Sequence, residues 1–190
     1  MNQQGVTFLE VIVVVAILMI VSSLVSPSIQ DWRQKRAMES DFHAILAQID
    51  YLKTRARTLN GTAVLSCASN SGRGTVLSYQ VSTNPQSSVS DLATGFIAGV
   101  VENPVEKAAD YNLLSGKSLV VSDICNGMPA IITASGLIGV QGSGQPLVIE
   151  IEPQSGKATL GAFMIVVNSF TGFIQKYKWQ LPAGRWAEID

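Results

Sequence analysis

Few residues of this chain are placed where they could do chemistry, and the most unusual of them is Glu10. It is the only charged residue between Met1 and Asp31, and it stands in a run that is otherwise almost entirely apolar. A carboxylate at the centre of a membrane-spanning helix costs about 2.5–3.5 kcal/mol. A carboxylate kept in such a run needs a positively charged partner, and no side chain in this part of the chain supplies one. The pattern indicates a charge-pairing role for Glu10.

The run around Glu10 is long enough to cross a membrane. Bilayer hydrocarbon is roughly 30 Å thick and needs about 20 mostly apolar residues in a helix. Residues 6–25 supply that length, with Thr7, Glu10, Ser22 and Ser23 as the polar interruptions. A secretory signal peptide is disfavoured, because the leader has no basic residue and a Gly precedes the apolar core. A plain single-pass anchor explains the length but leaves Glu10 without a purpose.

The leader, the carboxylate and a later proline stand in the register of a known signal. Gly5 is followed by Val6, with Glu10 fifth and Pro27 twenty-second after that Gly. This spacing resembles the class III signal of type IV pilins and type II secretion pseudopilins. Two features depart from the family: the first mature residue is Val rather than the usual Phe, and the leader lacks the usual Lys or Arg.

The resemblance implies a processing step and an assembly step. A prepilin peptidase is expected to cut after Gly5 and to methylate the new amino terminus on Val6. Glu10 is expected to neutralise the terminal amine of a neighbouring subunit, because an amine and a carboxylate that are desolvated together cost far less than either alone. Pro27 matches the proline that recurs in the family's assembly helix.

Beyond Pro27 the apolar residues follow a helical period. Their gaps of three and four residues are typical of an amphipathic helix with one face on a core. We expect one helix over residues 6–59, roughly 80 Å long at 1.5 Å per residue, with a kink at Pro27. We expect it to stop at Asn60-Gly61, where the glycine takes the left-handed conformation. The residues of the apolar stripe are Met38, Phe42, Ile45, Ile49, Leu52, Ala56 and Leu59.

The charged residues of this helix are expected on its solvated side. Exposed ion pairs contribute about 0–1 kcal/mol each, so we predict no large stabilisation from them. The first three basic residues lie just past the apolar run and could also touch lipid headgroups or acidic groups of neighbouring subunits. The only histidine, His43, is expected to be a surface or packing residue. The basic residues are Arg33, Lys35, Arg36, Lys53, Arg55 and Arg57, and the acidic ones are Asp31, Glu39, Asp41 and Asp50.

From residue 62 the pattern changes to short strands rich in β-branched residues. Turn signals separate these strands, including residues 153–156 and 168–172, and the Gly-rich residues 139–146 are expected to form an exposed loop. The predicted strands are residues 62–68, 75–81, 96–101, 117–122, 130–134, 147–152, 162–167 and 173–179.

The predicted fold class is α+β: a long N-terminal α-helix packed on an antiparallel β-sheet globular head. The helix has a membrane-embedded half and an amphipathic half, and the pilin resemblance implies the same lollipop shape. The expected divisions are a leader over 1–5, a transmembrane and assembly helix over 6–27, an amphipathic helix over 28–60 and a head over 61–190.

The two cysteines, Cys67 and Cys125, are expected to pair. The resemblance places the head outside the inner membrane, where the compartment is oxidising and two cysteines tend to form a disulfide. Closing so long a loop contributes roughly 4 kcal/mol in the chain-entropy model. Two buried free thiols are the alternative.

The end of the helix and the first strand narrow the resemblance. Residues 52–67 run from an Ala-Arg stretch through Asn60 to a strand that ends at Cys67. This arrangement resembles the GspH/FimT subgroup, which contains the minor pseudopilin of type II secretion and the FimT and FimU minor pilins.

The composition argues against an enzyme. With one histidine on the helix, the head has no Ser/His/Asp arrangement. Residues 115–118 end like a phosphate loop, but the earlier Gly that such a loop requires falls on Tyr111. Glu150 and Glu152 are too few for a calcium site, which takes six to eight oxygens. We therefore expect no cofactor and no metal.

Nucleic-acid binding is weighed separately. The net charge is −1, so the chain lacks the overall basic charge of a nucleic-acid binder. Lys176, Lys178 and Arg185 stand beside aromatic residues near the carboxyl end and could contact DNA. Alternatively, the aromatics of this strand point inward and the lysines point into water.

Together these features predict a minor pilin of a type IV pilus, in its tip or initiation complex. The expected partners are a prepilin peptidase, the other minor pilins and the major pilin subunits. The expected location is the inner membrane, crossed once with the head in the periplasm, and then the pilus at the cell surface. The alternatives are a minor pseudopilin of a type II secretion system and a DNA-binding or adhesive subunit displayed on a pilus.

Overall fold

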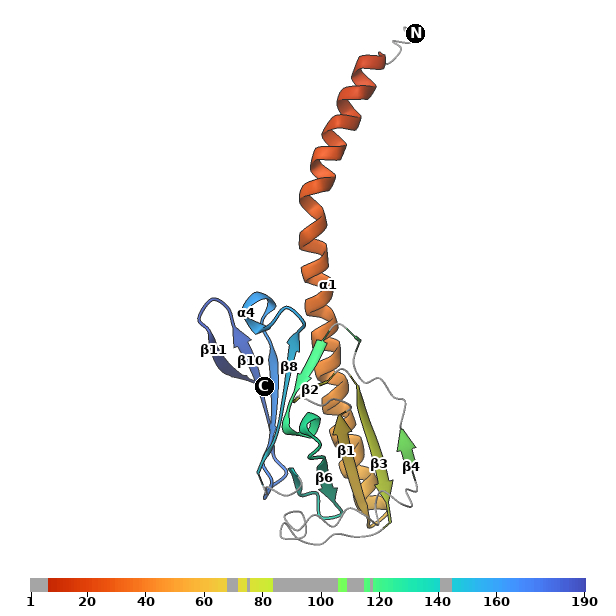
Figure 1. The fold of residues 1–190 in the computed structure, drawn as a ribbon, viewed down its shortest axis with the longest axis vertical. Coiled ribbons are helices and arrows are strands. Elements are labelled where there is room, and N and C mark those ends of the chain that lie inside the picture. The colour runs from red at the N-terminus through yellow and green to blue at the C-terminus, as the bar shows by residue number, and fades with distance from the viewer. Residues whose placement is uncertain are drawn as a thin grey trace.

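A single long helix carries all the strands at one end of the molecule (Figure 1). The computed structural model describes residues 7–67, 72–74, 76–83, 106–108, 115–116, 118–140 and 145–190, with the backbone alone for residues 23–28 and 106–108. Helix α1 spans Phe8–Thr58 and is roughly 75 Å long at 1.5 Å per residue. It curves gently in Figure 1 and continues through position 27, so Pro27 does not end it.

The carboxyl end of α1 closes with an asparagine in the left-handed conformation. Asn60 has a φ of 46°. Its N–H donates to the Arg57 carbonyl oxygen at 3.1 Å, and the Gly61 N–H donates to the Ala56 carbonyl oxygen at 2.8 Å. This is the Schellman pattern, and it corrects the prediction that Gly61 takes the left-handed conformation. Gly61 is required for another reason, because a Cβ there would lie 1.8 Å from the Ser82 carbonyl oxygen.

The head contains two antiparallel sheets, which confirms the α+β class. In the connections that the structure describes lie two short helices, η1 (Asp123–Asn126) and α4 (Lys157–Leu160). The five-stranded sheet has the order β4 (Glu106–Ala108), β3 (Leu77–Ser82), β1 (Thr62–Cys67), β6 (Ala130–Thr133), β7 (Ile138–Val140). The six-stranded sheet has the order β11 (Arg185–Ile189), β10 (Ile174–Gln180), β9 (Phe163–Val167), β8 (Leu147–Pro153), β5 (Ser118–Val121), β2 (Arg73–Gly74).

The structure differs from the predicted strands in several places, and the short strands β2 and β4 were not predicted. Residues 138–140 form β7, which pairs with β6 and is buried. The exposed loop predicted over residues 139–146 is therefore wrong at residues 139 and 140. The sequence analysis missed β11, whose charged residues and preceding turn conceal its alternation. The turn predicted at 153–156 leads into α4 rather than directly into the next strand. The strand predicted at residues 96–101 lies outside the described residues.

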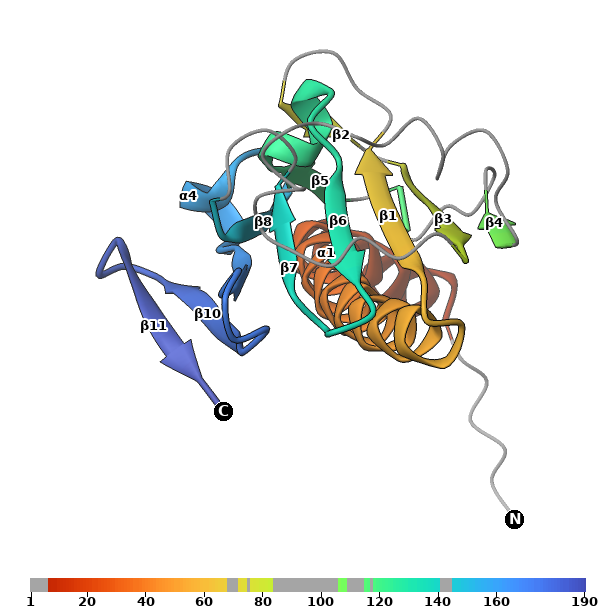
Figure 2. The same cartoon turned by 90° about the horizontal axis from the view of Figure 1, so that it is seen from below.

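The core forms where the second half of α1 meets both sheets. The predicted stripe is confirmed, since its first six residues are at most 2% exposed. Ala63 and Ile132 pack on it from the five-stranded sheet, and Ile149 and Ile165 from the six-stranded one. The view along α1 in Figure 2 shows both sheets on the same side of the helix, with β10 and β11 extending past it. The six stripe residues are Met38, Phe42, Ile45, Ile49, Leu52 and Ala56.

One acidic residue of α1 is buried rather than solvated. Asp41 is 3% exposed, which corrects its predicted place on the solvated side. Its carboxylate accepts hydrogen bonds from the Ser115 N–H at 2.7 Å and from the Ser115 hydroxyl at 2.9 Å. Hydrogen bonds to a charged acceptor offset the cost of removing that charge from water. Asp41 therefore ties the segment that precedes β5 to the helix.

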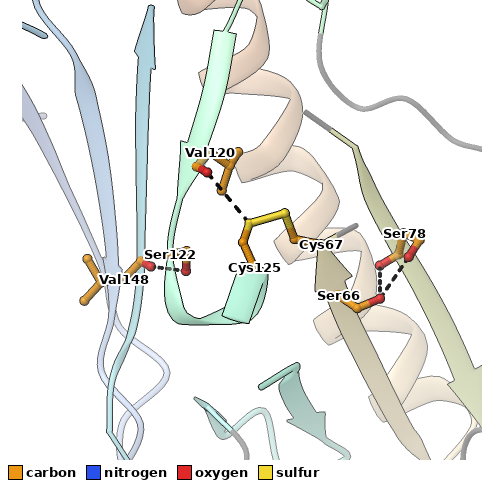
Figure 3. The surroundings of a disulfide bond; sticks show 7 residues. All are labelled: Ser66, Cys67, Ser78, Val120, Ser122, Cys125 and Val148. Atoms are coloured by element: carbon orange, nitrogen blue, oxygen red, sulfur yellow. Dashed lines mark hydrogen bonds between the residues drawn. A yellow bond between two sulfur atoms is a disulfide. The ribbon is translucent and has the colours of Figure 1, made fainter. Parts of the chain in front are cut away.

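A disulfide joins the two sheets through their connection. Cys67 ends β1, and Cys125 lies in η1, between β5 of the six-stranded sheet and β6 of the five-stranded sheet (Figure 3). The cysteines are 58 residues apart in the chain. Beside the bond, the Ser122 hydroxyl donates to the Val148 carbonyl oxygen on β8, which holds this connection against the six-stranded sheet.

Replacing Asp41 with Ala is expected to lower the free energy of unfolding by about 2–3 kcal/mol, because two hydrogen bonds to a charged acceptor are lost and a backbone N–H loses its partner. Urea unfolding of the full-length protein in detergent, followed by circular dichroism, measures the change. Asp50→Ala removes an exposed carboxylate from the same helix and should change the value by less than about 0.5 kcal/mol. Equal losses in the two variants would contradict the role given to Asp41.

Replacing both Cys67 and Cys125 with Ala is expected to lower the free energy of unfolding by about 4 kcal/mol, because the unfolded chain regains the freedom of a long loop. The same unfolding measurement applies, with and without a reducing agent. Reduction should weaken the wild-type protein to a similar extent and leave the double variant unchanged. A wild-type protein insensitive to reduction would argue against the bond.

Candidate assembly site

The first turn of α1 is set by a side-chain cap. Thr7 is the N-cap residue, with φ −79° and ψ 148°, and its hydroxyl oxygen accepts a hydrogen bond from the Glu10 N–H at 3.3 Å. The Thr7 carbonyl oxygen accepts from the N–H groups of Glu10 and Val11 at 3.1 and 3.3 Å. Thr and Glu three residues apart at a helix start match the capping-box pattern. The sequence analysis missed Thr7, although this spacing was the signal for it.

Glu10 is the acidic residue of this first turn. The side chain is exposed, and it forms no ion pair with any described residue. The amino end of a helix favours a negative charge, because its free N–H groups carry a partial positive charge. The helix therefore orients the carboxylate but gives it no full counter-charge.

The apolar residues that follow Glu10 are uncovered on every side. Phe8 is 82% and Leu9 72% exposed, and the large apolar residues from Val11 to Val21 are 42–69% exposed. Monomeric soluble proteins rarely expose a continuous apolar surface of this length, which instead marks contact with lipid or with other proteins. The head covers none of it, because burial of α1 begins at Met38.

Several predicted assembly features are only partly described. Gly5 and Val6 lie outside the described residues, and at Pro27 only the backbone is described. Across the parts of the chain that the structure describes, no helix is both long enough and apolar enough to span a bilayer.

The carboxyl-terminal hairpin separates the predicted cations from its tryptophans, although the Lys178 amino group lies 5.3 Å from the ring centroid of Phe163 on the neighbouring β9. In the β10–β11 pairing, Lys178 lies opposite Ala187 and Gln180 opposite Arg185. Opposite residues, and residues two apart on one strand, share a face of a sheet. Lys176, Lys178 and Arg185 therefore share one face.

The aromatic residues lie on the other face of the hairpin. Trp179 pairs with Trp186, their ring centroids 5.2 Å apart. The cation beside them is Lys157 of α4, whose amino group lies 5.1 and 5.5 Å from the two ring centroids. The same amino group donates to a Glu150 carboxylate oxygen at 2.8 Å. Sequence reasoning could not find Lys157, because it is distant from the tryptophans in the chain.

The acidic residues considered for calcium are already paired. Glu150 forms an ion pair with Lys157, and the buried Glu152 lies 3.4 Å from the Arg73 guanidinium. Among the described residues, no group of three or more metal-ligating side chains could hold a metal ion. His43 is exposed and lies edge-on to Phe42, with ring centroids 5.3 Å apart.

Comparison with known proteins gives one finding, and it concerns the amino end. A family model described as the prokaryotic N-terminal methylation motif matches residues 1–26. No curated protein and no solved structure matches the chain. The matched residues contain Gly5, Thr7 and Glu10 and most of the uncovered apolar part of α1.

Proposed function

We propose that this chain is a minor pilin of a type IV pilus, acting in the tip or initiation complex. The premise is the N-terminal methylation motif, which supports a type IV pilin-like protein that a prepilin peptidase processes, that is anchored in the membrane and that assembles with other pilins. The observation that carries the proposal is the match between this motif and an uncovered apolar helix with one carboxylate in its first turn.

The proposed life of the subunit begins in the inner membrane, with the head in the periplasm. The peptidase cuts after Gly5 and methylates Val6, so the chain divides into a leader (1–5), an assembly helix (6–27), an amphipathic helix (28–60) and a head (61–190). Without its leader, the mature amino terminus lies one residue before the Thr7 cap.

Assembly then brings the charged groups of two subunits together. Removing a lone ion from water costs several kcal/mol, whereas an adjacent opposite charge returns much of that cost. In this proposal Glu10 accepts the amine of a neighbouring minor or major pilin, and the apolar helices cover one another as they leave the lipid. Pro27 removes one backbone donor from α1 and gives the helix a place to adjust as it packs.

Assignment to the GspH/FimT subgroup rests on the junction of helix and head. α1 ends in the Asn60 left-handed cap and leads directly into β1, which ends at the disulfide-bonded Cys67. A minor pseudopilin of a type II secretion system is the second candidate, because residues 1–26 carry the motif that pilins and pseudopilins share.

Display of a DNA-binding or adhesive surface is the third candidate. DNA contact through Lys176, Lys178 and Arg185 would use the hairpin face without the tryptophans, so it would rest on phosphate contacts and lack base stacking.

Deleting the gene is expected to remove most surface pili, and complementation with the wild-type gene should restore them, because initiation would lack one of its subunits. Electron microscopy of negatively stained cells gives the count. Unchanged piliation together with lost release of secreted proteins would favour the pseudopilin alternative over the pilus.

Replacing Glu10 with Ala is expected to abolish complementation, because a neighbour's amine would be left without its partner. Breaking one partner of a buried ion pair costs about 3–5 kcal/mol, on the order of a hundredfold or more in an assembly equilibrium. Pilus counts and immunoblots of sheared pili measure the loss, while the amount in the membrane fraction should not change. Asp31→Ala, which removes an exposed carboxylate farther along α1, serves as the control. If Glu10→Ala supported wild-type piliation, the assembly role of Glu10 would be wrong.

A further inference from the structure

A short segment of α1 lies between the uncovered apolar stretch and the head, and it combines an exposed aromatic ring with cations. Trp32 is 57% exposed and Ile29 is 42% exposed. The guanidinium carbon of Arg36 lies 5.3 Å from the centroid of the Trp32 ring. Spacings of three and four residues put these three side chains on one face of the helix. With Arg33 and Lys35, they are called the interfacial segment below.

Within the described part of the chain, the cations of the interfacial segment have no acidic partner at ion-pair distance. Arg33, Lys35 and Arg36 are exposed, and none of them forms an ion pair with a described residue. This differs from the head, where Arg73 and Lys157 are each paired with a glutamate. Asp31 and Glu39 lie on the same stretch of α1, so the interfacial segment and its neighbours carry a small excess of positive charge at the boundary between the apolar stretch and the head.

One of these cations also lines a cleft. A cleft of about 620 Å³ separates α1 from the turns that carry Gly116 and Gln154, and its lining includes Arg33, Gln30 and Gln34. A guanidinium can bind a phosphate through two parallel hydrogen bonds, and amide N–H groups can add further ones. The lining contains one guanidinium, three amide side chains and no carboxylate among the described residues, so it offers hydrogen-bond donors to a phosphodiester.

The position of the interfacial segment matches the thickness of a bilayer. Trp32 lies 22 residues after Glu10, which is about 33 Å along a helix at 1.5 Å per residue. Bilayer hydrocarbon is roughly 30 Å thick. A helix inserted with Glu10 at one hydrocarbon boundary would thus place Trp32 at the other, among the headgroups. Tryptophan, with its apolar ring and one polar N–H, is enriched at that level, and arginine and lysine side chains extend from there to the phosphates.

We propose that the interfacial segment binds the phosphodiester headgroups of anionic phospholipids, and that this contact fixes the height of the head above the bilayer before assembly. The proposal rests on the membrane step of the proposed function and goes beyond it by assigning a lipid class and the residues that recognise it. A merely solvated helix face would leave the Trp32 ring in water and would show no preference among lipids.

The test uses the full-length protein with Trp179 and Trp186 replaced by Phe, so that Trp32 is the only fluorophore of its kind. The protein is reconstituted into phosphatidylcholine vesicles that contain increasing fractions of brominated phosphatidylglycerol or of brominated phosphatidylcholine, and quenching of Trp32 is recorded. A basic residue near an anionic surface contributes about fivefold in affinity. At equal fractions in the vesicle, brominated phosphatidylglycerol should therefore quench Trp32 as strongly as a roughly fivefold or greater fraction of brominated phosphatidylcholine would. This ratio is the enrichment of phosphatidylglycerol around Trp32.

The variants test which residues carry that preference. Arg33→Gln with Arg36→Gln should reduce the enrichment to near one, and Arg33→Lys with Arg36→Lys should retain most of it. Lys178→Gln with Arg185→Gln removes the same charge from exposed positions of the head and should leave the enrichment unchanged. Raising the salt concentration should lower the wild-type enrichment, because ions screen exposed charges.

Two results would overturn the proposal while leaving the proposed function intact. In one, the protein floats with the vesicles but Trp32 is not quenched by either lipid. In the other, both lipids quench Trp32 equally. Failure of the protein to float with vesicles at all would contradict the membrane step of the proposed function, and the interfacial segment's role with it.

Discussion

One continuous helix has to satisfy two different apolar environments, and the rest of the structure follows from that constraint. Along α1 the apolar residues are uncovered from Phe8 to Val21, and the residues of the apolar stripe are then almost fully buried from Met38 to Ala56. Burial of the second half, at about 25 cal/mol for each Å² of apolar surface, holds the two sheets to the helix. The first half contributes nothing to the stability of the isolated chain. The apolar surface of this first half can be buried only by contact with lipid or with another protein molecule.

The amino end of α1 stabilises the Glu10 carboxylate by less free energy than it costs to remove that charge from water. A helix amino terminus stabilises an adjacent negative charge by about 0.3–1 kcal/mol, and by about 2 kcal/mol in favourable partly buried geometry. Removing an ion from water costs several kcal/mol. The Thr7 cap and the helix dipole therefore leave a deficit, which a full positive charge or protonation of the carboxylate would offset. In water the deficit disappears, so the need for a partner arises only when α1 enters an apolar environment.

The features that local pattern determines were predictable, and the features that depend on distant partners were not. The spacing of three and four residues identified the buried side of α1, because a helix repeats every 3.6 residues whatever it packs against. Asp41 looked like a surface carboxylate, since nothing nearby in the sequence announces Ser115 as its hydrogen-bond partner. Likewise, β7 is buried only because β6 lies beside it.

At the amino end, local spacing identified some functional residues and missed one. Gly5, Glu10 and Pro27 were identified by register alone, and the motif match over residues 1–26 includes the first two of them. The helix start at Thr7 was missed, although its spacing to Glu10 was present in the sequence. The omission has a physical cause. An apolar run is a requirement of the surroundings of the helix, whereas a cap is a requirement of the free N–H groups of any helix, so the one does not imply the other.

The matched motif covers only the first 26 residues. Any feature that distinguishes this chain from others with the same motif must therefore lie in the rest of the chain, most of which is the head. Charge pairing and helix packing at the amino end would serve any subunit with the same motif, so they cannot select one position in a filament. Selection needs surfaces that differ between subunits. This head has two faces of unlike chemistry on one hairpin, with Lys176 and Lys178 on the first and the Trp179–Trp186 pair on the second. Strand alternation fixes that separation. The tryptophan face carries Lys157, which is paired with Glu150, and the other face carries Lys176 and Lys178, whose amino group lies 5.3 Å from the Phe163 ring centroid. The two faces therefore differ in chemistry, and under the proposed function such a difference would let neighbouring subunits be told apart.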